Sequence, residues 1–305
     1  MTDHKQALEE ARRELRPPED AFERLLQRRD RKRRNGRIAA GVVGLVIGVG
    51  ALLTVVIAFT NGGDEPEPAS TCAVAPSDVT GWWTGDGSGA DIAGDRTARL
   101  HGDATFGSGL VGQAFLLDGD GDFVSVPDDA ALDVGTRDFT IALWVNFDST
   151  EGEQILVEKW VQHSLEPEIV RGWTFTKFPD NFVSFAVAER MEPTYAESDS
   201  GLLDIPLRTW IHFAARRMGD TVEILLNGDV VASGTTPIEG TLDADTRSSI
   251  KFGHRGGPDD TSGSIDERGF FLDGRIDEVK LVVGRALSNG EIRAIVETEA
   301  SGNRC

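Results

Sequence analysis

The chain has 305 residues, of which 35 are glycine, 15 are phenylalanine and two are cysteine. The glycines follow no three-residue period, so the chain is not collagen-like, and a hydrophobic content of 39% is enough for a packed core. A net charge of −20 argues against a nucleic-acid-binding protein, because a phosphate backbone requires a basic face. The charge is uneven: residues 1–37 hold 12 Lys/Arg and 8 Asp/Glu, residues 38–60 hold none, and residues 61–305 hold 19 Lys/Arg and 43 Asp/Glu.

Residues 38–60 predict a transmembrane helix. They form an uninterrupted run of 23 residues without an ionisable side chain, and about 20 apolar residues span the hydrocarbon core of a bilayer. A cleaved signal peptide has a shorter apolar region behind a shorter basic start. Seven basic residues in 28–37 precede the run, and acidic residues follow it. The positive-inside rule therefore predicts a single-pass protein of the cell membrane with a cytoplasmic N-terminus and an extracytoplasmic C-terminal part.

Residues 1–37 form a basic cytoplasmic stub in this scheme. Its segment 17–34 is typical of a short amphipathic helix, which either lies on the lipid surface or docks a cytoplasmic partner. The basic cluster next to the span favours contact with anionic headgroups of the lipid bilayer. Within the span, Gly44 and Gly48 have the spacing that lets two helices approach closely, so homo-oligomerisation through the span is one expectation.

Residues 61–71 are rich in Pro, Gly and acidic side chains, which predicts an extended linker before an outer domain at 72–305. The two cysteines, Cys72 and Cys305, lie at the two ends of that domain. In an oxidising exterior this placement favours one disulfide over two free thiols. Such a disulfide requires the first and last strands of the domain to be neighbours.

The outer domain shows the two-residue period of β-strands. In 138–148 the side chains of Phe139, Ile141, Leu143 and further alternate residues fall on one face. Asn227-Gly228 is typical of a two-residue hairpin turn. Many short strands without crossover helices predict an all-β fold, in which two antiparallel sheets pack as a jelly-roll sandwich. Ser288 and Glu291 then form a capping-box pattern that predicts a short helix.

Six segments occur in the order found in one known family, and together they cover most of 76–298. They are GWWTGDGSGADIAGD (81–95), GLVGQAFLLDGDGDFVSVPDD (109–129), DFTIALWV (138–145), TWIHFAARR (209–217), EILLNGDVV (223–231) and DGRIDEVKLVVGRALSNGEI (273–292). The outer domain thus resembles the laminin-G-like (LamG-like) jelly-roll domain of the concanavalin A-like lectin/glucanase superfamily. The resemblance implies two curved antiparallel sheets with neighbouring termini.

The resemblance also implies a structural calcium between an N-terminal loop and a late strand. Asp277 falls on the same side of its strand as Val279 and Leu281, and a carboxylate on an apolar face needs a partner. The loop 84–95 supplies Asp86, Asp91 and Asp95, and calcium takes six to eight carboxylate and carbonyl oxygens. The alternatives for Asp277 are an ion pair with Arg275 or Lys280, or hydrogen bonds from backbone donors, and the loop acids could be ordinary solvated turn residues.

Residues 118–122 match the start of an EF-hand loop with Asp118, Asp120 and Asp122. The sixth position is Phe123, where the sharp turn of that loop needs glycine, and position twelve is Asp129 in place of Glu. The sequence therefore favours a Gly/Asp turn between two strands.

Two segments are candidates for contacts with a ligand at the rim of the sandwich. In 160–173, Trp160 and Trp173 bracket His163, and an aromatic face can stack on a sugar ring, although tryptophan in a sandwich also serves as core. The polar segment 253–269 contributes Arg255.

Catalysis finds little support in the sequence. Glucanases of the superfamily carry Glu-x-Asp-x-x-Glu on one strand; here only Glu197 and Asp199 fit, position 202 is leucine, and the surrounding AESDSG is typical of a loop. We therefore expect a non-enzymatic, membrane-anchored module that binds a glycan. The alternatives are a protein-binding adhesion or sensor ectodomain that signals through the span, and a glycoside hydrolase without the usual motif.

Overall fold

A computed structural model describes residues 79–162, 170–190, 194–201, 203–235, 243–244, 246–255 and 270–304. All of them belong to the compact unit Pro66–Cys305. The predicted stub, span and linker lie outside the described residues, as do Cys72, Cys305 and His163. No helix within the described ranges is both long and apolar enough to cross a bilayer.

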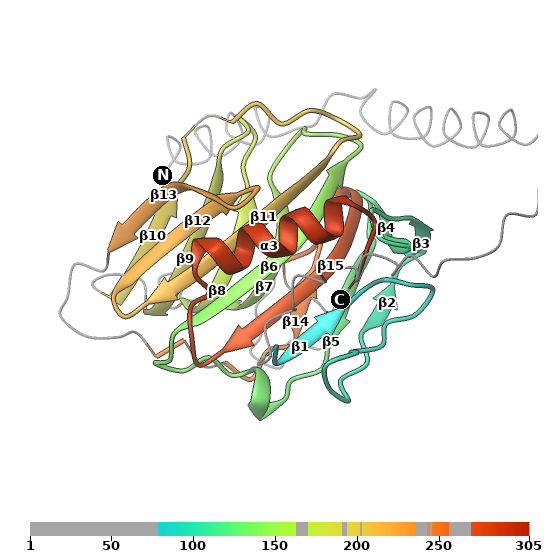
Figure 1. The fold of residues 1–305 in the computed structure, drawn as a ribbon. Helices are drawn as coiled ribbons and strands as arrows, with labels where there is room; N and C mark the ends of the chain where they lie inside the picture. The colour runs from blue at the N-terminus through green and yellow to red at the C-terminus, as the bar shows by residue number, and fades with distance from the viewer. Residues whose placement is uncertain are drawn as a thin grey trace, which may run out of the picture. The chain divides into compact units, whose positions relative to one another are not determined.

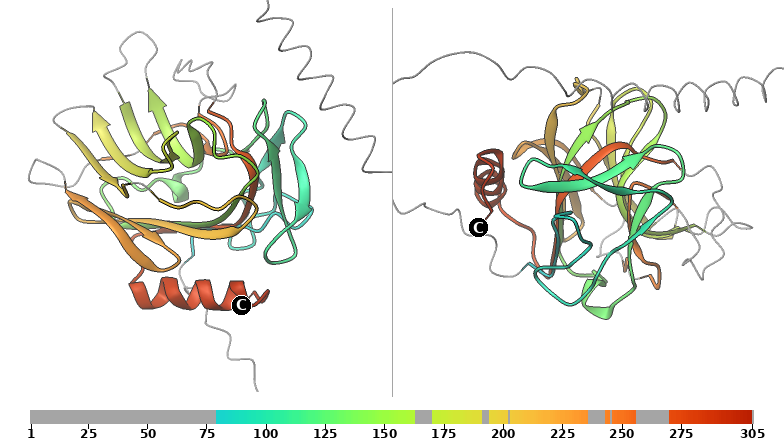
Figure 2. Two further views of the ribbon diagram at one scale, coloured as in Figure 1. Left: turned by 90° about the horizontal axis from the view of Figure 1, so that it is seen from above. Right: turned by 90° about the vertical axis from the view of Figure 1, so that its right-hand side faces the viewer.

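The described residues form two antiparallel sheets packed face to face (Figures 1 and 2). The eight-stranded sheet has the order β13-β12-β11-β6-β15-β4-β3, and β1 pairs with β15 beyond this path. Its strands are β1 (Gly81–Trp83), β3 (Thr105–Ser108), β4 (Gln113–Asp118), β6 (Phe139–Phe147), β11 (Trp210–Met218), β12 (Thr221–Leu226), β13 (Asp229–Thr235) and β15 (Asp273–Val283). The first and last described strands, β1 and β15, are therefore neighbours, as the resemblance implies.

The seven-stranded sheet has the order β10-β9-β8-β7-β14-β5-β2. Its strands are β2 (Arg99–His101), β5 (Phe123–Val126), β7 (Gln154–Gln162), β8 (Val170–Lys177), β9 (Val183–Arg190), β10 (Thr194–Asp199) and β14 (Ile250–Phe252). A 3₁₀ turn, η1 (Ala130–Leu132), follows β5 in the chain. The prediction of an all-β sandwich of two antiparallel sheets is confirmed.

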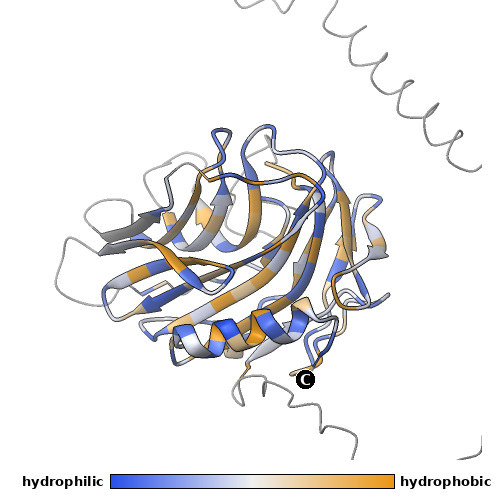
Figure 3. Cartoon of the chain, turned by 45° about the horizontal axis from the view of Figure 1, so that its top comes forward, coloured by the Kyte–Doolittle hydropathy of each residue, from blue (hydrophilic) through white to orange (hydrophobic). Residues whose placement is uncertain are grey.

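The core lies between the sheets and takes alternate residues from each strand. In β6 the side chains of Phe139, Ile141, Leu143, Val145 and Phe147 enter it, on the face that the sequence predicted. Figure 3 shows this alternation of apolar and polar residues along the strands. Because successive side chains point to opposite faces, each sheet also presents an outer face away from the core.

One helix, α3 (Asn289–Ala300), covers the outer face of the eight-stranded sheet (Figure 2). Its capping box is present as predicted: the Ser288 side chain accepts from the backbone of Glu291, and Glu291 reaches back to Ser288. Ile292 and Ile295 pack against the outer face of the sheet. No described helix lies on the seven-stranded sheet, whose outer face holds the candidate site.

Candidate functional site

Polar side chains cross the outer face of the seven-stranded sheet in register. Strand pairing places Arg99 opposite Ser125, Ser125 opposite Lys251, Lys251 opposite Glu158, and Glu158 opposite Thr174. Residues that are directly opposite each other share one face of a sheet. We call these five residues the polar row.

The row results from strand alternation. Val124 and Val126 flank Ser125 in β5 and enter the core, and Phe252 follows Lys251 in β14 in the same way. Their polar neighbours must therefore point to the outer face. The four inner members of the row are no more than 6% exposed, whereas Arg99 at the edge is exposed.

Arg255 forms hydrogen bonds with two members of the polar row and with one residue beside it. Its guanidinium donates to Glu158 Oε2 at 3.3 Å, to Glu153 Oε1 at 3.1 Å and to the hydroxyl of Thr174 at 3.3 Å. It also lies 5.3 Å from the ring centroid of Phe270. Arg255 is thus placed on the outer face, in a polar cluster that joins β7 to β8.

Glu158 is the group at the centre of this cluster. Its side chain is fully buried, Oε2 accepts from Thr174 at 3.0 Å, and Oε1 has no hydrogen-bond partner. Burial raises the pKa of Glu158, and the positive charges of Arg255 and Lys251 partly oppose this rise. Its Oε1 thus remains a buried acceptor on the outer face of the sheet.

A hollow of about 300 Å³ lies at the Arg99 end of the row. Its lining is Asp95, Arg96, Thr97, Arg99, Pro127, Asp128 and Asp129. Asp128 also accepts from Lys159 at 2.6 Å, which fixes one wall to β7. Asp95, predicted as a metal ligand, therefore lines a hollow that presents both hydrogen-bond donors and acceptors.

The two tryptophans predicted as ligand contacts lie on opposite faces of the seven-stranded sheet. Trp173 is fully buried in the core between the sheets. Trp160 is 7% exposed and packs on the outer face with Val170 and Ala186. Trp173 is thus a core residue, which was the alternative to a ligand contact. Of the two tryptophans, only Trp160 lies on the same face as the polar row.

A β-bulge changes the position of Asp277. The register of β15 against β6 shifts between Asp277 and Lys280, and the extra residue Glu278 has φ +53. The simple alternation that placed Asp277 beside Val279 is therefore wrong: Val279 enters the core, whereas Asp277 lies opposite Trp144 on the outer face. A bulge re-aims side chains in this way.

Asp277 is fully buried and caps the loop that contains Leu110 and Val111. Its Oδ2 accepts from the backbone amides of Leu110 at 2.8 Å and Val111 at 3.1 Å, and its Oδ1 has no partner. Burial raises the pKa of Asp277 to about 7, against the lowering effect of these two hydrogen bonds.

The loop acids also have protein partners. Asp91 accepts from the backbone amide of Trp82 at 2.8 Å and from Arg96 Nε at 2.9 Å. Asp86 accepts from the amide of Gln113 at 2.7 Å and from Arg304 Nη1. Two guanidinium groups therefore contact the carboxylates to which calcium was predicted to bind.

No three of the four predicted ligands, Asp86, Asp91, Asp95 and Asp277, bring their oxygens within 4.8 Å of one another. Calcium at these residues would have to displace Arg96 and Arg304. Calcium at these four residues stays a prediction. In the structure, the carboxylates of Asp91 and Asp86 accept hydrogen bonds from Arg96 and Arg304.

A different set of carboxylates does converge. Asp103, Asp118 and Asp122 place one oxygen each within 4.8 Å of one another. Asp122 accepts from the amides of Asp103 at 2.7 Å and Asp118 at 3.2 Å, and burial raises its pKa to about 6. The cluster is an acidic group that could hold a metal ion, and it includes two members of the EF-hand-like run. Asp103 was not predicted, because it comes from a separate turn.

The carboxylates Glu197 and Asp199 lie on strand β10, so the prediction of a loop there is wrong. The glucanase pattern still stops at Leu202.

Comparisons with known proteins agree with this fold. In solved structures, the chain resembles Domain 4 of AbnA, a GH43 extracellular arabinanase from Geobacillus stearothermophilus, in complex with arabinotriose. The TM-score is 0.53 at 16% identity, over 72% of this chain and 98% of that one. A comparison with curated proteins found no match.

Two further similar structures are binding domains of botulinum neurotoxin DC, one in complex with SialylT and one with rat synaptotagmin II. The first has a TM-score of 0.50 at 14% identity, over 69% of this chain and 48% of that one. The second has a TM-score of 0.53 at 15% identity, over 73% of this chain and 52% of that one. The chain thus spans about half of each neurotoxin structure.

A family model also matches residues 118–293, which is more than half of the chain. The chain therefore belongs to the concanavalin A-like lectin/glucanases superfamily.

Proposed function

We propose that the chain is a membrane-anchored binding module that presents its sandwich outside the cell and binds a glycan. The observation that carries the proposal is the hollow beside Arg99, which is lined by three carboxylates and two guanidinium groups. Its volume is at the lower end of the range for small-molecule sites, which is about 300–1,000 Å³.

The chemistry of this surface suits sugar hydroxyls, which both donate and accept hydrogen bonds. Arg99 and Arg96 offer donors, whereas Asp95, Asp128 and Asp129 offer acceptors. Trp160 is on the outer face of the seven-stranded sheet but packs with Val170 and Ala186, so it does not line the hollow. Because residues 61–305 hold 43 acidic side chains against 19 basic ones, we expect a neutral glycan over an anionic one.

The comparisons support a binding role without naming the ligand. Two similar structures are complexes with sugars, and one is a complex with a protein. At 14–16% identity they carry only the fold, so a protein partner is the second candidate.

The test is binding of the full chain, purified in detergent, to a broad panel of glycans. We expect capture of one class of neutral sugar, a loss of at least about tenfold in affinity for Arg99→Ala, and no change for Arg293→Ala. Arg293 is a matched control because its ion pair with Asp229 is exposed on α3. A panel without binding from a folded chain would contradict the glycan proposal and favour a protein partner.

Calcium is a separate part of the proposal. The panel is therefore measured with calcium and with EDTA. Loss of binding in EDTA, repeated by Asp122→Asn, would assign a functional ion to the Asp103, Asp118 and Asp122 cluster. Unchanged binding in EDTA would show that recognition needs no metal.

A further inference from the structure

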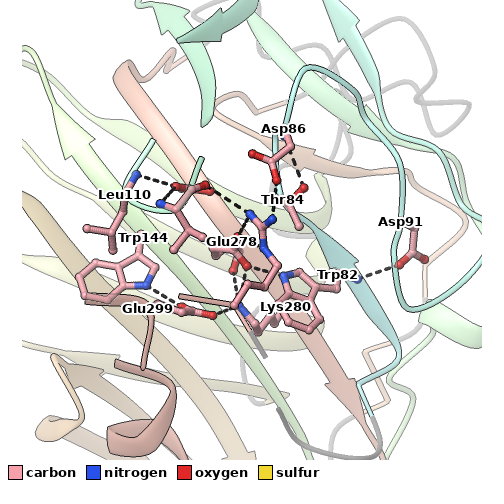
Figure 4. Close-up of polar contacts among 12 residues, drawn as sticks. Trp82, Thr84, Asp86, Asp91, Leu110, Trp144, Glu278, Lys280 and Glu299 are labelled. Atoms are coloured by element: carbon pink, nitrogen blue, oxygen red, sulfur yellow. Dashed lines mark hydrogen bonds and ion pairs between the residues drawn. The ribbon is translucent and has the colours of Figure 1, made fainter. Parts of the chain in front are cut away.

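We infer that Arg304 is an internal cation: it supplies to Asp86 the positive charge that calcium was predicted to bring, and it also neutralises the neighbouring Glu278. Arg304 lies beyond α3, and its side chain donates to Glu278 at the bulge of β15. Figure 4 shows Glu278 beside Trp82 and Lys280, which also contact it. The inference is independent of the proposed glycan binding.

The contacts of Arg304 resemble the ligand set of a hard cation. Its guanidinium donates to Glu278 Oε1 at 2.7 Å from Nε, to Asp86 Oδ2 from Nη1, and to the carbonyl oxygen of Val111 at 3.3 Å from Nη2. Two carboxylates and a backbone carbonyl are the oxygen types that calcium takes. One planar side chain therefore occupies the point at which these oxygens meet.

Glu278 needs this charge. The bulge places it on the outer face with a fully buried side chain. Its Oε2 accepts from Trp82 Nε1 at 2.6 Å and from Lys280 Nζ at 3.1 Å, whereas among the described residues only Arg304 donates to Oε1. Removal of Arg304 would leave a buried carboxylate oxygen without a donor, which is strongly destabilising.

The end of α3 positions Arg304. The amides of Ser301 and Gly302 bond back to carbonyls of the last helical turn, and Gly302 takes φ +77 for the reversal. Glu299, in that last turn, accepts from Trp144 Nε1 at 2.7 Å and also from Lys280. The helix end is thus held to the sheet before Arg304 makes its contacts, so the guanidinium is preorganised.

The test compares thermal unfolding of the full chain, Arg304→Ala and the exposed control Arg293→Ala, each with EDTA and with millimolar calcium. We expect Arg304→Ala to lower the Tm in EDTA by roughly 5–10 °C, because a buried charge loses its partner in a domain of this size. Calcium should then raise the Tm of Arg304→Ala by more than that of the wild type, because it binds the oxygens that Arg304 contacted. The additional change Asp86→Asn should abolish this gain.

Three results would overturn the inference. In the first, Arg304→Ala unfolds at the same temperature as Arg293→Ala. In the second, the Tm of Arg304→Ala gains nothing from calcium. In the third, calcium raises the Tm of the wild type and Asp86→Asn abolishes that rise, which would support the calcium prediction. If Arg304→Ala does not fold, Arg304→Lys is measured; we expect a smaller fall in Tm without a calcium gain, and no fall would contradict the inference.

Discussion

Glu158 and Asp277 are two buried carboxylates that reach their positions in different ways. Each is fully buried, each has one oxygen without a partner, and burial raises the pKa of each. Glu158 reaches its position by regular alternation in β7, whereas Asp277 reaches its position through a bulge in β15. Glu158 therefore belongs to the Arg255 cluster on the seven-stranded sheet, and Asp277 belongs to the frame that holds loop 109–112.

The buried side chain of His212 allows a test of how burial shifts the pKa of one residue. It is 1% exposed on the outer face of the eight-stranded sheet, its ring centroid lies 5.1 Å from that of Trp144, and its Nδ1 has no partner. Burial lowers the pKa of His212 to about 3, and the charge of Lys280 adds to this effect.

We predict that His212→Phe becomes more stable relative to the wild type as the pH falls from 7 to 5. In this range the unfolded histidine gains a proton that the folded one cannot accept, so the wild type loses free energy of unfolding. The relative gain should reach about 2 kcal/mol at pH 5, and it should vanish between pH 7 and 8, which serves as the control. Urea unfolding at each pH measures it; a difference independent of pH would show that His212 titrates normally.

At the scale of the element, β15 organises the molecule. It pairs with β1, β4 and β6, so it joins both ends of the described chain to the centre of one sheet. Close approach to β6 requires a glycine at position 274: a Cβ there would lie 2.2 Å from the carbonyl oxygen of Asn146. Gly284, just after the strand, also has a positive φ but faces open space.

We predict that Gly274→Ala lowers the free energy of unfolding by about 3 kcal/mol or more, because backbone atoms of the central strand must move apart. Gly284→Ala, with φ +104, should cost only the backbone strain, on the order of 1 kcal/mol. Chemical denaturation of both variants tests this. Equal losses would mean that φ alone, and not the contact with β6, determines the cost.

The sequence predicted those elements whose determinants are local. The alternation of β6, the turn at Asn227-Gly228 and the capping box at Ser288 all depend on residues within a few positions of one another, and all three are present. The hairpin joins β12, which ends at Leu226, to β13, which begins at Asp229.

What could not be predicted depends on contacts that are distant in the chain. Nothing in the run 273–283 marks the bulge, because the register comes from pairing with β6. Asp103 joins Asp118 and Asp122 only through the fold. Arg304 had no motif at all, since its partners Asp86 and Glu278 are up to 218 positions away.

At the scale of the whole molecule, the charge pattern and the fold are both consistent with a membrane-anchored binding module. The basic stub and apolar run 38–60 predict an anchor, and the acidic C-terminal part forms a sandwich of a superfamily that includes binding domains. We propose that the anchor keeps the sandwich outside the cell, where the hollow beside Arg99 binds a glycan. Membrane orientation and glycan binding can therefore be tested in one experiment.

The most direct test offers a fluorescent form of the captured glycan to intact, washed cells that carry the full chain. We predict that these cells bind it without permeabilisation, that Arg99→Ala abolishes the signal, and that Arg293→Ala retains it. Surface expression of all three chains is measured with a C-terminal tag. Binding that appears only after permeabilisation would contradict the extracytoplasmic placement, and equal binding by Arg99→Ala would contradict the proposed site on the seven-stranded sheet.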